Sequence, residues 1–363
     1  MTNLKADERV SIQLRELYRS CGYLPYKVSK FEEYDLYMQN KSFLTSEHVL
    51  AFSDMDGKLM ALKPDVTLSI IKNTQDSGEV FKVCYAENVY RVPRGAYGFK
   101  EIMQTGLECI GELDVYAMGE VLMLAAKSLE TISESWALDV ADLGIVSGIL
   151  VDETLTDSQT AQLLALISEK NLHGLQALCV QLNLSEQTTS LLSNLVTVFG
   201  PMEATLNAYE QMDLPEACAE ALANLKTLCA MMKRCGLDQI NLDFSVVNDM
   251  SYYNGLIFAG FIDGIPESVL SGGRYDYLMR RMGKKGQAVG FAVYLDQLPR
   301  LMDSKPQIDV DVLITYEDGT DAVSIMDAVQ RVTAGGESVR VQRAGETSIR
   351  CRRRIELRGE AKA

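Results

Sequence analysis

The chain has 363 residues, of which 47% are hydrophobic and 23% are charged, and its formal net charge is −15. This length allows two or three domains, and the ordinary composition without low-complexity tracts excludes long disordered regions. The negative charge disfavours nucleic-acid binding over a broad surface, because phosphate groups would be repelled.

No apolar run approaches the ~18 residues of a membrane span, and the polar first segment differs from a signal peptide. We therefore expect a cytoplasmic protein with no membrane partner. Eight cysteines are scattered without a CxxC pair. This spacing favours reduced thiols over a disulfide framework or a zinc site, and we expect no metal and no cofactor.

The first elements are a helix and a hairpin. Apolar residues at helical spacing predict a helix over 7–21, which Gly22 ends. After an extended aromatic stretch, alternating patterns predict strands over 81–90 and 101–111. These strands make a hairpin with a basic, glycine-bearing loop over 91–100.

Helical patterns dominate from residue 119 to about residue 237. A short strand over 136–144 interrupts them, and residues 155–236 read approximately as a helical insertion. Strand patterns return over 240–247, 251–262 and 267–278, and the apolar run 287–298 is expected to be helical. Hairpins, then helices, then hairpins predict an α+β fold, with an antiparallel sheet and helices on one side.

The end of the chain reads as a small α/β unit over 306–363, which follows a core of residues 1–305. Residues 338–363 carry a net charge of +5, which leaves −20 on the first 337 residues. The cluster RCRRR at 350–354 lies in this basic tail. It is either a solvated face or frayed end, or a contact for an acidic partner or a phosphate.

Two segments pair polar side chains at a spacing of two or four residues. In LKPDVTLSIIK, Asp65 and Thr67 would share one face of an extended strand, where a carboxylate and a hydroxyl can hold an ammonium group. In the second hairpin strand, Gln104 and Glu108 flank Gly106 on one face, which would leave space for a small ligand. The alternatives are an ordinary turn residue for Asp65 and a solvent face for the strand.

Further candidates lie in the hairpin loop and near the end of the core. Arg91 and Arg94 could contact an anion, although surface loops are often basic without a ligand. Tyr252 and Tyr253 are adjacent, and the pair Gly272 and Gly273 precedes Arg274 and Tyr275. His48 and His173 lie in no recognisable motif, so we expect structural or surface roles for both.

Together, and in this order, these segments resemble the catalytic domain of the histidyl-tRNA synthetase family, which has the class II synthetase fold, from residue 7 to about residue 300. LKPDVT resembles the family's Arg-Pro-Glu-x-Thr, and QTGLECIG resembles its second signature motif. MSYYNGLIF is similar to the tyrosine segment that lines the imidazole pocket, LSGGRYDYL is similar to Gly-Gly-Arg-Tyr-Asp, and AVGFAVYLDQL is similar to the third motif.

The resemblance implies a histidine site. Asp65 and Thr67 would hold the amino group, Arg91 would pair with the carboxylate, and Gln104 and Glu108 would contact polar ligand atoms. The resemblance also assigns three tyrosines to the imidazole ring, namely Tyr252, Tyr253 and Tyr275.

Two positions depart from the family's catalytic pattern. Gln297 stands where the third motif has an arginine that holds the nucleotide, and Asn248 stands where a catalytic arginine precedes the tyrosine segment. The loop RGAYGFKEI also lacks the family's Gly-Arg-x-Arg pattern. Removal of one preorganised donor costs roughly 100- to 1,000-fold in rate, so we expect no catalytic residues and no adenylate formation.

A histidine pocket without catalysis resembles the regulatory subunits of ATP phosphoribosyltransferase, a histidyl-synthetase-like family of bacteria. This resemblance implies a hetero-oligomer with a short-form catalytic subunit, in which a homodimer of this chain supports the first step of histidine biosynthesis and conveys feedback by histidine. The 63 residues from Leu301 are too few for a complete anticodon-binding domain, so tRNA is not an expected partner. An active histidine-activating ligase, such as a divergent histidyl-tRNA synthetase, and a plain scaffold with a dead pocket are the alternatives.

Overall fold

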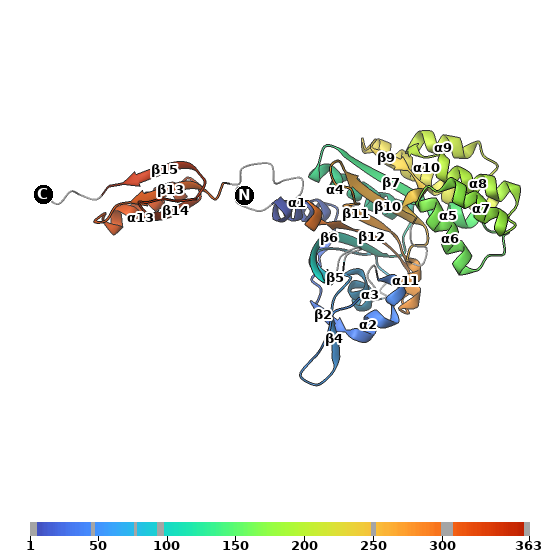
Figure 1. The fold of residues 1–363 in the computed structure, drawn as a ribbon, viewed down its shortest axis with the longest axis horizontal. Helices are drawn as coiled ribbons and strands as arrows, with labels where there is room; N and C mark the ends of the chain where they lie inside the picture. The colour runs from blue at the N-terminus through green and yellow to red at the C-terminus, as the bar shows by residue number, and fades with distance from the viewer. Residues whose placement is uncertain are drawn as a thin grey trace. The chain divides into compact units, whose positions relative to one another are not determined.

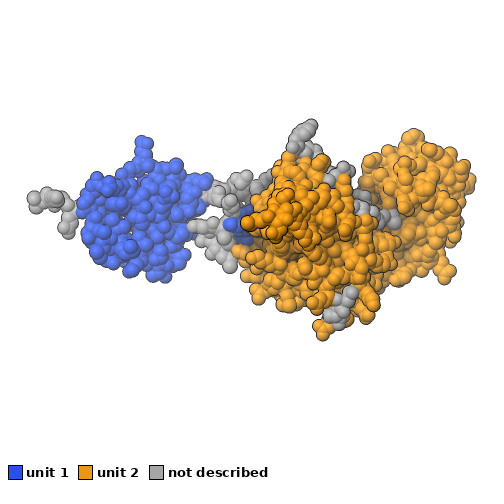
Figure 2. All heavy atoms as spheres, turned by 90° about the horizontal axis from the view of Figure 1, so that it is seen from below, with its two compact units in different colours: residues 1–9, 300–363 blue, residues 10–299 orange. Residues whose placement is uncertain are grey.

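The computed structural model describes residues 6–44, 48–75, 78–92, 98–247, 252–298 and 308–358. The chain forms two compact units, one of residues 10–299 and one of residues 1–9 and 300–363, which Figure 2 distinguishes by colour. The boundary at residue 305 that we expect from the sequence stays a prediction. No helix of the described residues is long and apolar enough to cross a membrane.

Among the described residues of the larger unit, nine strands form one sheet, most of whose neighbouring strands are antiparallel. The β1–β5 and β7–β9 pairs are parallel. The strands, in spatial order, are β1 Leu24–Pro25, β5 Phe81–Arg91, β6 Lys100–Gly111, β12 Gln287–Tyr294, β11 Leu270–Arg274, β10 Leu256–Ile262, β7 Trp136–Asp142, β9 Ile240–Leu242 and β8 Gly200–Pro201. The predicted α+β class with a mainly antiparallel sheet is confirmed, whereas the expected placement of helices on one side is wrong, because helices pack on both faces.

One face of this sheet is covered by α1 Ala6–Ser20 and α4 Val115–Ile132 (Figure 1). Val10, Leu14 and Tyr18 recur every four residues on α1 and are fully buried. The Tyr18 ring meets Phe291 of β12 edge to face at 5.7 Å, and its hydroxyl lies 3.0 Å from Ser128 Oγ of α4. The two helices therefore pack against each other as well as on the sheet.

Helices between β7 and β9 form a cluster of their own at one end of the sheet (Figure 1). Thr156 begins one of these helices, α6, with a capping box, in which its side chain accepts from the backbone N–H of Gln159 and the side chain of Gln159 accepts from the backbone N–H of Thr156. The helices are α5 Leu143–Ile149, α6 Asp157–Ser168, α7 Leu172–Gln181, α8 Glu186–Thr197, α9 Met202–Glu210 and α10 Ala219–Arg234, with η2 Glu216–Cys218 and η3 Phe244–Val246 beside them. The helical region 155–236 agrees with these bounds, and its status as an inserted domain stays a prediction.

The other face of the sheet, near β5 and β6, packs on short elements. A small antiparallel sheet has the order β2 Phe31–Glu33, β4 Leu59–Leu62 and β3 Ala51–Ser53. Beside it lie α2 Tyr34–Gln39, η1 Lys41–Phe43, α3 Thr67–Asn73 and α11 Asp276–Arg281. Residues of α2, α3, β5 and α11 share one hydrophobic cluster, which includes Tyr37, Leu68, Val83 and Leu278.

The C-terminal unit is a parallel sheet of order β14 Val339–Arg343, β13 Val310–Tyr316 and β15 Cys351–Leu357, with α13 Ala322–Ala334 on one face. The cluster RCRRR is thus not a frayed end, because most of it lies in β15. Arg353 pairs with Glu337 at 2.6 Å. Arg354 pairs in register with Leu313, and so lies on the face without α13.

Several expectations about local structure are wrong. The segment 240–247 is strand β9 followed by η3, not one continuous strand. Residues 287–298 are not a helix but strand β12 followed by η4 Leu295–Gln297. This strand is central and buried on both faces, so it lacks the alternation that marks a half-exposed strand. Thr67 begins helix α3 instead of continuing a strand, and the segment 267–278 is strand β11 followed by helix α11.

Candidate functional site

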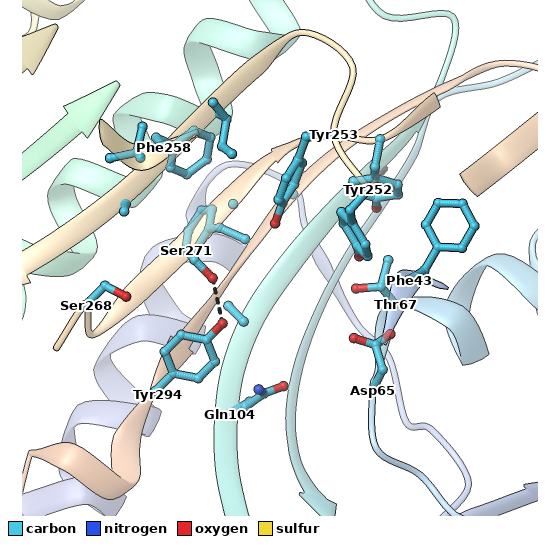
Figure 3. A pocket seen from close by; sticks show the side chains of 18 of the residues that line it. Phe43, Asp65, Thr67, Gln104, Tyr252, Tyr253, Phe258, Ser268, Ser271 and Tyr294 are labelled. Atoms are coloured by element: carbon cyan, nitrogen blue, oxygen red, sulfur yellow. Dashed lines mark hydrogen bonds between the residues drawn. The ribbon is translucent and has the colours of Figure 1, made fainter. Parts of the chain in front are cut away.

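A cavity of about 430 Å³ lies on the sheet face opposite α1. Strand β6 shows on which face the cavity lies. The Thr105 hydroxyl lies 3.2 Å from that of Ser11 on α1, so the adjacent Gln104, which lines the cavity, points to the opposite face. All eight ligand-contacting residues expected from the sequence line this cavity, namely Asp65, Thr67, Arg91, Gln104, Glu108, Tyr252, Tyr253 and Tyr275. Figure 3 shows Asp65, Thr67 and Gln104 around this space.

Asp65 and Thr67 reach the cavity through a helix start, not through strand alternation. Asp65 Oδ1 accepts from the backbone N–H of Leu68 at 2.9 Å, which ties the carboxylate to the first turn of α3. Burial raises the pKa of Asp65, and the nearby Arg91 opposes this rise. The Asp65 side chain therefore both stabilises the start of α3 and lines the cavity.

Glu108 is the buried carboxyl group of the site, with 2% of its surface exposed. The Thr67 hydroxyl donates to its Oε1 at 2.7 Å, and the Tyr275 hydroxyl donates to its Oε2. Burial raises the pKa of Glu108 to about 8, although both hydrogen bonds lower it. At neutral pH the carboxyl group is therefore poised to ionise when a cationic or hydrogen-bond-donating ligand arrives.

Two glycines shape the site around Glu108. A Cβ at Gly106 would lie 2.2 Å from the carbonyl oxygen of Phe291 and 2.6 Å from the hydroxyl oxygen of Tyr85. The space beside Gly106 is thus filled by Tyr85, and is not left for a ligand as expected. A Cβ at Gly290 would lie 1.8 Å from Glu108 Oε2, so this glycine makes room for the carboxylate.

Aromatic rings form one wall of the cavity. Tyr252 lies 4.6 Å from Tyr253, 5.8 Å from Tyr275 and 6.0 Å from Phe43, measured between ring centroids. Burial raises the pKa of Tyr275 well above its ordinary value, so its hydroxyl stays protonated at neutral pH. These rings can enclose a flat ligand ring, with Glu108 at its edge.

Arg91 supplies the positive charge. Among the described lining residues it is the one cationic side chain. Its guanidinium lies 5.5 Å from the ring centroid of Tyr294, whose hydroxyl lies 2.6 Å from Ser271 Oγ. The cavity thus offers carboxyl groups, one guanidinium and an aromatic wall, which together suit a small zwitterion with a flat polar ring.

Several lining residues were missed from the sequence. Phe43, Tyr85, Ser271 and Tyr294 line the cavity, and Tyr294 was missed because its strand was read as a helix. The pairing of Tyr294 with Gln104 across β12 and β6 places both on the cavity side. Alternation along a correctly assigned strand would have found it.

Other candidates lie elsewhere or outside the described residues. Gln297 lies on η4, not among the lining residues, and its buried Oε1 has no hydrogen-bond partner in the described part of the chain. Arg274 pairs with Asp276 at 2.8 Å instead of facing the cavity. His48 and His173 are both exposed. Asn248 and Arg94 fall outside the described residues.

A metal ion has no evident site in the part of the chain that is described, where no three His, Cys, Asp or Glu side chains gather to hold one. All eight cysteines are free thiols, and Cys84, Cys109, Cys179, Cys218 and Cys229 are buried.

Residues 2–298 match the family model of histidyl-tRNA synthetase. The chain belongs to the histidyl-tRNA synthetase family. This family explains the ordered motifs and the class II sheet.

Within this family, the chain is similar to proteins named as regulatory subunits of ATP phosphoribosyltransferase. The chain is 25% identical to an ATP phosphoribosyltransferase regulatory subunit of Acetivibrio thermocellus, over 88% of this chain and 79% of the relative. It superposes with a TM-score of 0.83 and 25% identity on an ATP phosphoribosyltransferase regulatory subunit/histidyl-tRNA synthetase from Bacillus halodurans C, over 98% and 94% of the two chains.

A chain of the ATP phosphoribosyl transferase complex from Thermotoga maritima shares the fold, with a TM-score of 0.62 and 18% identity over 80% of this chain and 97% of that chain. The resemblance of this chain to regulatory subunits of ATP phosphoribosyltransferase is confirmed.

Proposed function

We propose that this chain is a non-catalytic regulatory subunit of ATP phosphoribosyltransferase that binds histidine in the cavity and conveys feedback inhibition. One observation carries the proposal: side chains suited to each part of histidine converge on one cavity of about 430 Å³. Asp65 and Thr67 would hold the ammonium group, Arg91 the carboxylate, and Glu108 the imidazole. The volume lies within the ~300–1,000 Å³ that is usual for small-molecule sites.

The charges around the cavity argue against nucleotide chemistry. Activation of an amino acid with ATP needs guanidinium or ammonium groups, or metal ions, against the phosphates. The described lining residues carry one such group, Arg91, and the family's third-motif arginine is replaced by Gln297. A pocket that keeps the amino-acid site and loses the phosphate site suits a sensor.

The partner in this proposal is a short-form ATP phosphoribosyltransferase catalytic subunit, with this chain as a homodimer inside a cytoplasmic hetero-oligomer. Histidine would act by favouring one arrangement of the assembly over another. The required coupling free energy is typically ~1–3 kcal/mol, which a few charged contacts in the cavity can supply.

The deciding experiment combines this chain with the short-form catalytic subunit of the same organism and follows phosphoribosyl-ATP formation. We expect activity that requires this chain and that falls when histidine is added. Activity that is indifferent to this chain would remove the proposal. Histidine-dependent pyrophosphate exchange by the isolated chain would instead favour an active ligase.

Paired variants link the effect to the cavity. Glu108→Gln removes the group that ionises when the ligand binds but keeps the shape, so we expect histidine to inhibit this variant at least about tenfold more weakly, because a hydrogen bond to a charged group is lost. Glu101→Gln is the matched control, since Glu101 is an exposed carboxylate on the same strand. Equal inhibition of both variants would contradict the site.

A further inference from the structure

Arg91 lies near the end of strand β5 and has an aromatic neighbour inside the cavity. No carboxylate of the described residues forms a salt bridge with Arg91, and its guanidinium instead lies 5.5 Å from the Tyr294 ring centroid. An arginine side chain has many rotamers, and a ligand must order them before a bidentate contact forms. A ring face that attracts the guanidinium orders the side chain before the ligand arrives, and so reduces the loss of side-chain entropy on binding.

Tyr294 is itself held from three directions. Its hydroxyl lies 2.6 Å from Ser271 Oγ on the neighbouring strand β11, a contact that Figure 3 marks. Its backbone N–H donates to the Val269 carbonyl at 2.8 Å, and it pairs with Gln104 of β6. Because β12 is a central strand, neither its backbone nor its hydroxyl can move independently of the sheet.

We propose that Tyr294, anchored by Ser271, positions Arg91 for the carboxylate of the ligand and so makes the pocket select amino acids over the corresponding amines. This inference rests on the proposed histidine site. Asp65 lies close enough to Arg91 for the guanidinium to stabilise its charged form. Both side chains line the same cavity, so one α-amino acid would offer its ammonium group to Asp65 and its carboxylate to Arg91.

Neither Tyr294 nor Ser271 belongs to the site residues that the sequence predicts. Tyr294 touches Arg91 and not necessarily the ligand, so it is a positioning residue. Its loss should therefore weaken only those ligands that use Arg91. A purely structural role in the cavity wall would weaken all ligands equally.

The test compares histidine with histamine, which keeps the imidazole and the amine but lacks the carboxylate. Isothermal titration of the full chain measures the dissociation constants of both ligands, and the histamine-to-histidine ratio reports carboxylate recognition. We expect a ratio well above one for the wild type and near one for Arg91→Gln. Tyr294→Leu should lower the ratio by about two- to fivefold while leaving histamine affinity unchanged.

Further variants separate the ring from its anchor. Tyr294→Phe and Ser271→Ala each keep the ring and lose the hydroxyl contact, so each should lower the ratio less than Tyr294→Leu does. In Arg91→Gln, adding Tyr294→Leu should change nothing further, because the residue being positioned is already absent. Tyr277→Leu is the matched control. The guanidinium of Arg280 lies 4.6 Å from the centroid of this exposed ring, and neither residue is among those that line the cavity.

The outcomes distinguish this inference from the proposed function. If Tyr294→Leu keeps the wild-type ratio of dissociation constants while Arg91→Gln lowers it to near one, the histidine site is supported and the positioning role of Tyr294 is overturned. An equal loss of both ligands in Tyr294→Leu also overturns it, in favour of a structural role. If the wild type binds neither ligand, the histidine site fails and the inference fails with it.

Discussion

Burial raises the pKa of Glu108, so that its ionisation depends on the charge of the groups around it. Its two oxygens accept from Thr67 and Tyr275, and no described cation pairs with it. The desolvation of the charged form therefore outweighs both hydrogen bonds. A ligand that donates a hydrogen bond or carries a positive charge would stabilise the charged form of Glu108.

The raised pKa of Glu108 also predicts a pH dependence of stability. The folded state keeps its proton up to about pH 8, whereas the unfolded chain loses it near its ordinary pKa. The contribution of Glu108 to the free energy of unfolding is therefore fully present below the unfolded pKa and is lost as the pH rises through about 8. Urea unfolding at several pH values should show the wild type losing stability relative to Glu108→Gln over this window.

Glu101→Gln provides the comparison, because this carboxylate is exposed on the same strand. Parallel pH profiles for the wild type and Glu108→Gln would mean that Glu108 ionises normally in the folded protein. The assignment of Glu108 as the charge sensor of the cavity would then be lost.

At the level of the strand, Gly106 and Gly290 allow β5, β6 and β12 to carry Tyr85 and Glu108 side by side. An added methyl group at Gly106 would meet the Phe291 carbonyl at 2.2 Å, which is a backbone atom of a central strand. Gly106→Ala should therefore lower the free energy of unfolding by about 3 kcal/mol, measured by denaturant titration.

Gly98→Ala is the control for this prediction. No atom lies within 4 Å of the methyl group that it would add, so the expected change is within about 0.5 kcal/mol. Similar stability of the two variants would show that β6 and β12 separate more easily than their contacts indicate.

At the scale of the whole molecule, the two compact units differ in charge. Residues 10–299 carry the entire net charge of −15, because the remaining residues balance to zero. All described residues that line the cavity lie between 43 and 294, within the larger unit.

A truncation tests the boundary proposed at residue 305. A chain of residues 1–305 should bind histidine with a dissociation constant within about twofold of the full chain, because every described lining residue of the cavity belongs to it. Titration calorimetry measures the affinity, and circular dichroism checks that the sheet is intact. Lost binding in a folded truncated chain would show that the two units depend on each other.

The sequence by itself determined the α+β class, the hairpin of β5 and β6, and the residues that carry polar chemistry. Helix α1, the alternation of Gln104 and Glu108, and the ordered motifs are local signals, and local signals survive in a single sequence. For the same reason the family could be inferred from short segments in their order.

Only the tertiary structure decided how these segments meet. Tyr294 was missed because β12 is buried on both faces and so shows no alternation. Tyr85 fills the space beside Gly106, and Thr67 reaches Glu108 across 41 positions of the chain. Such contacts depend on strand order and register, which bring together residues far apart in the chain and which no local pattern encodes.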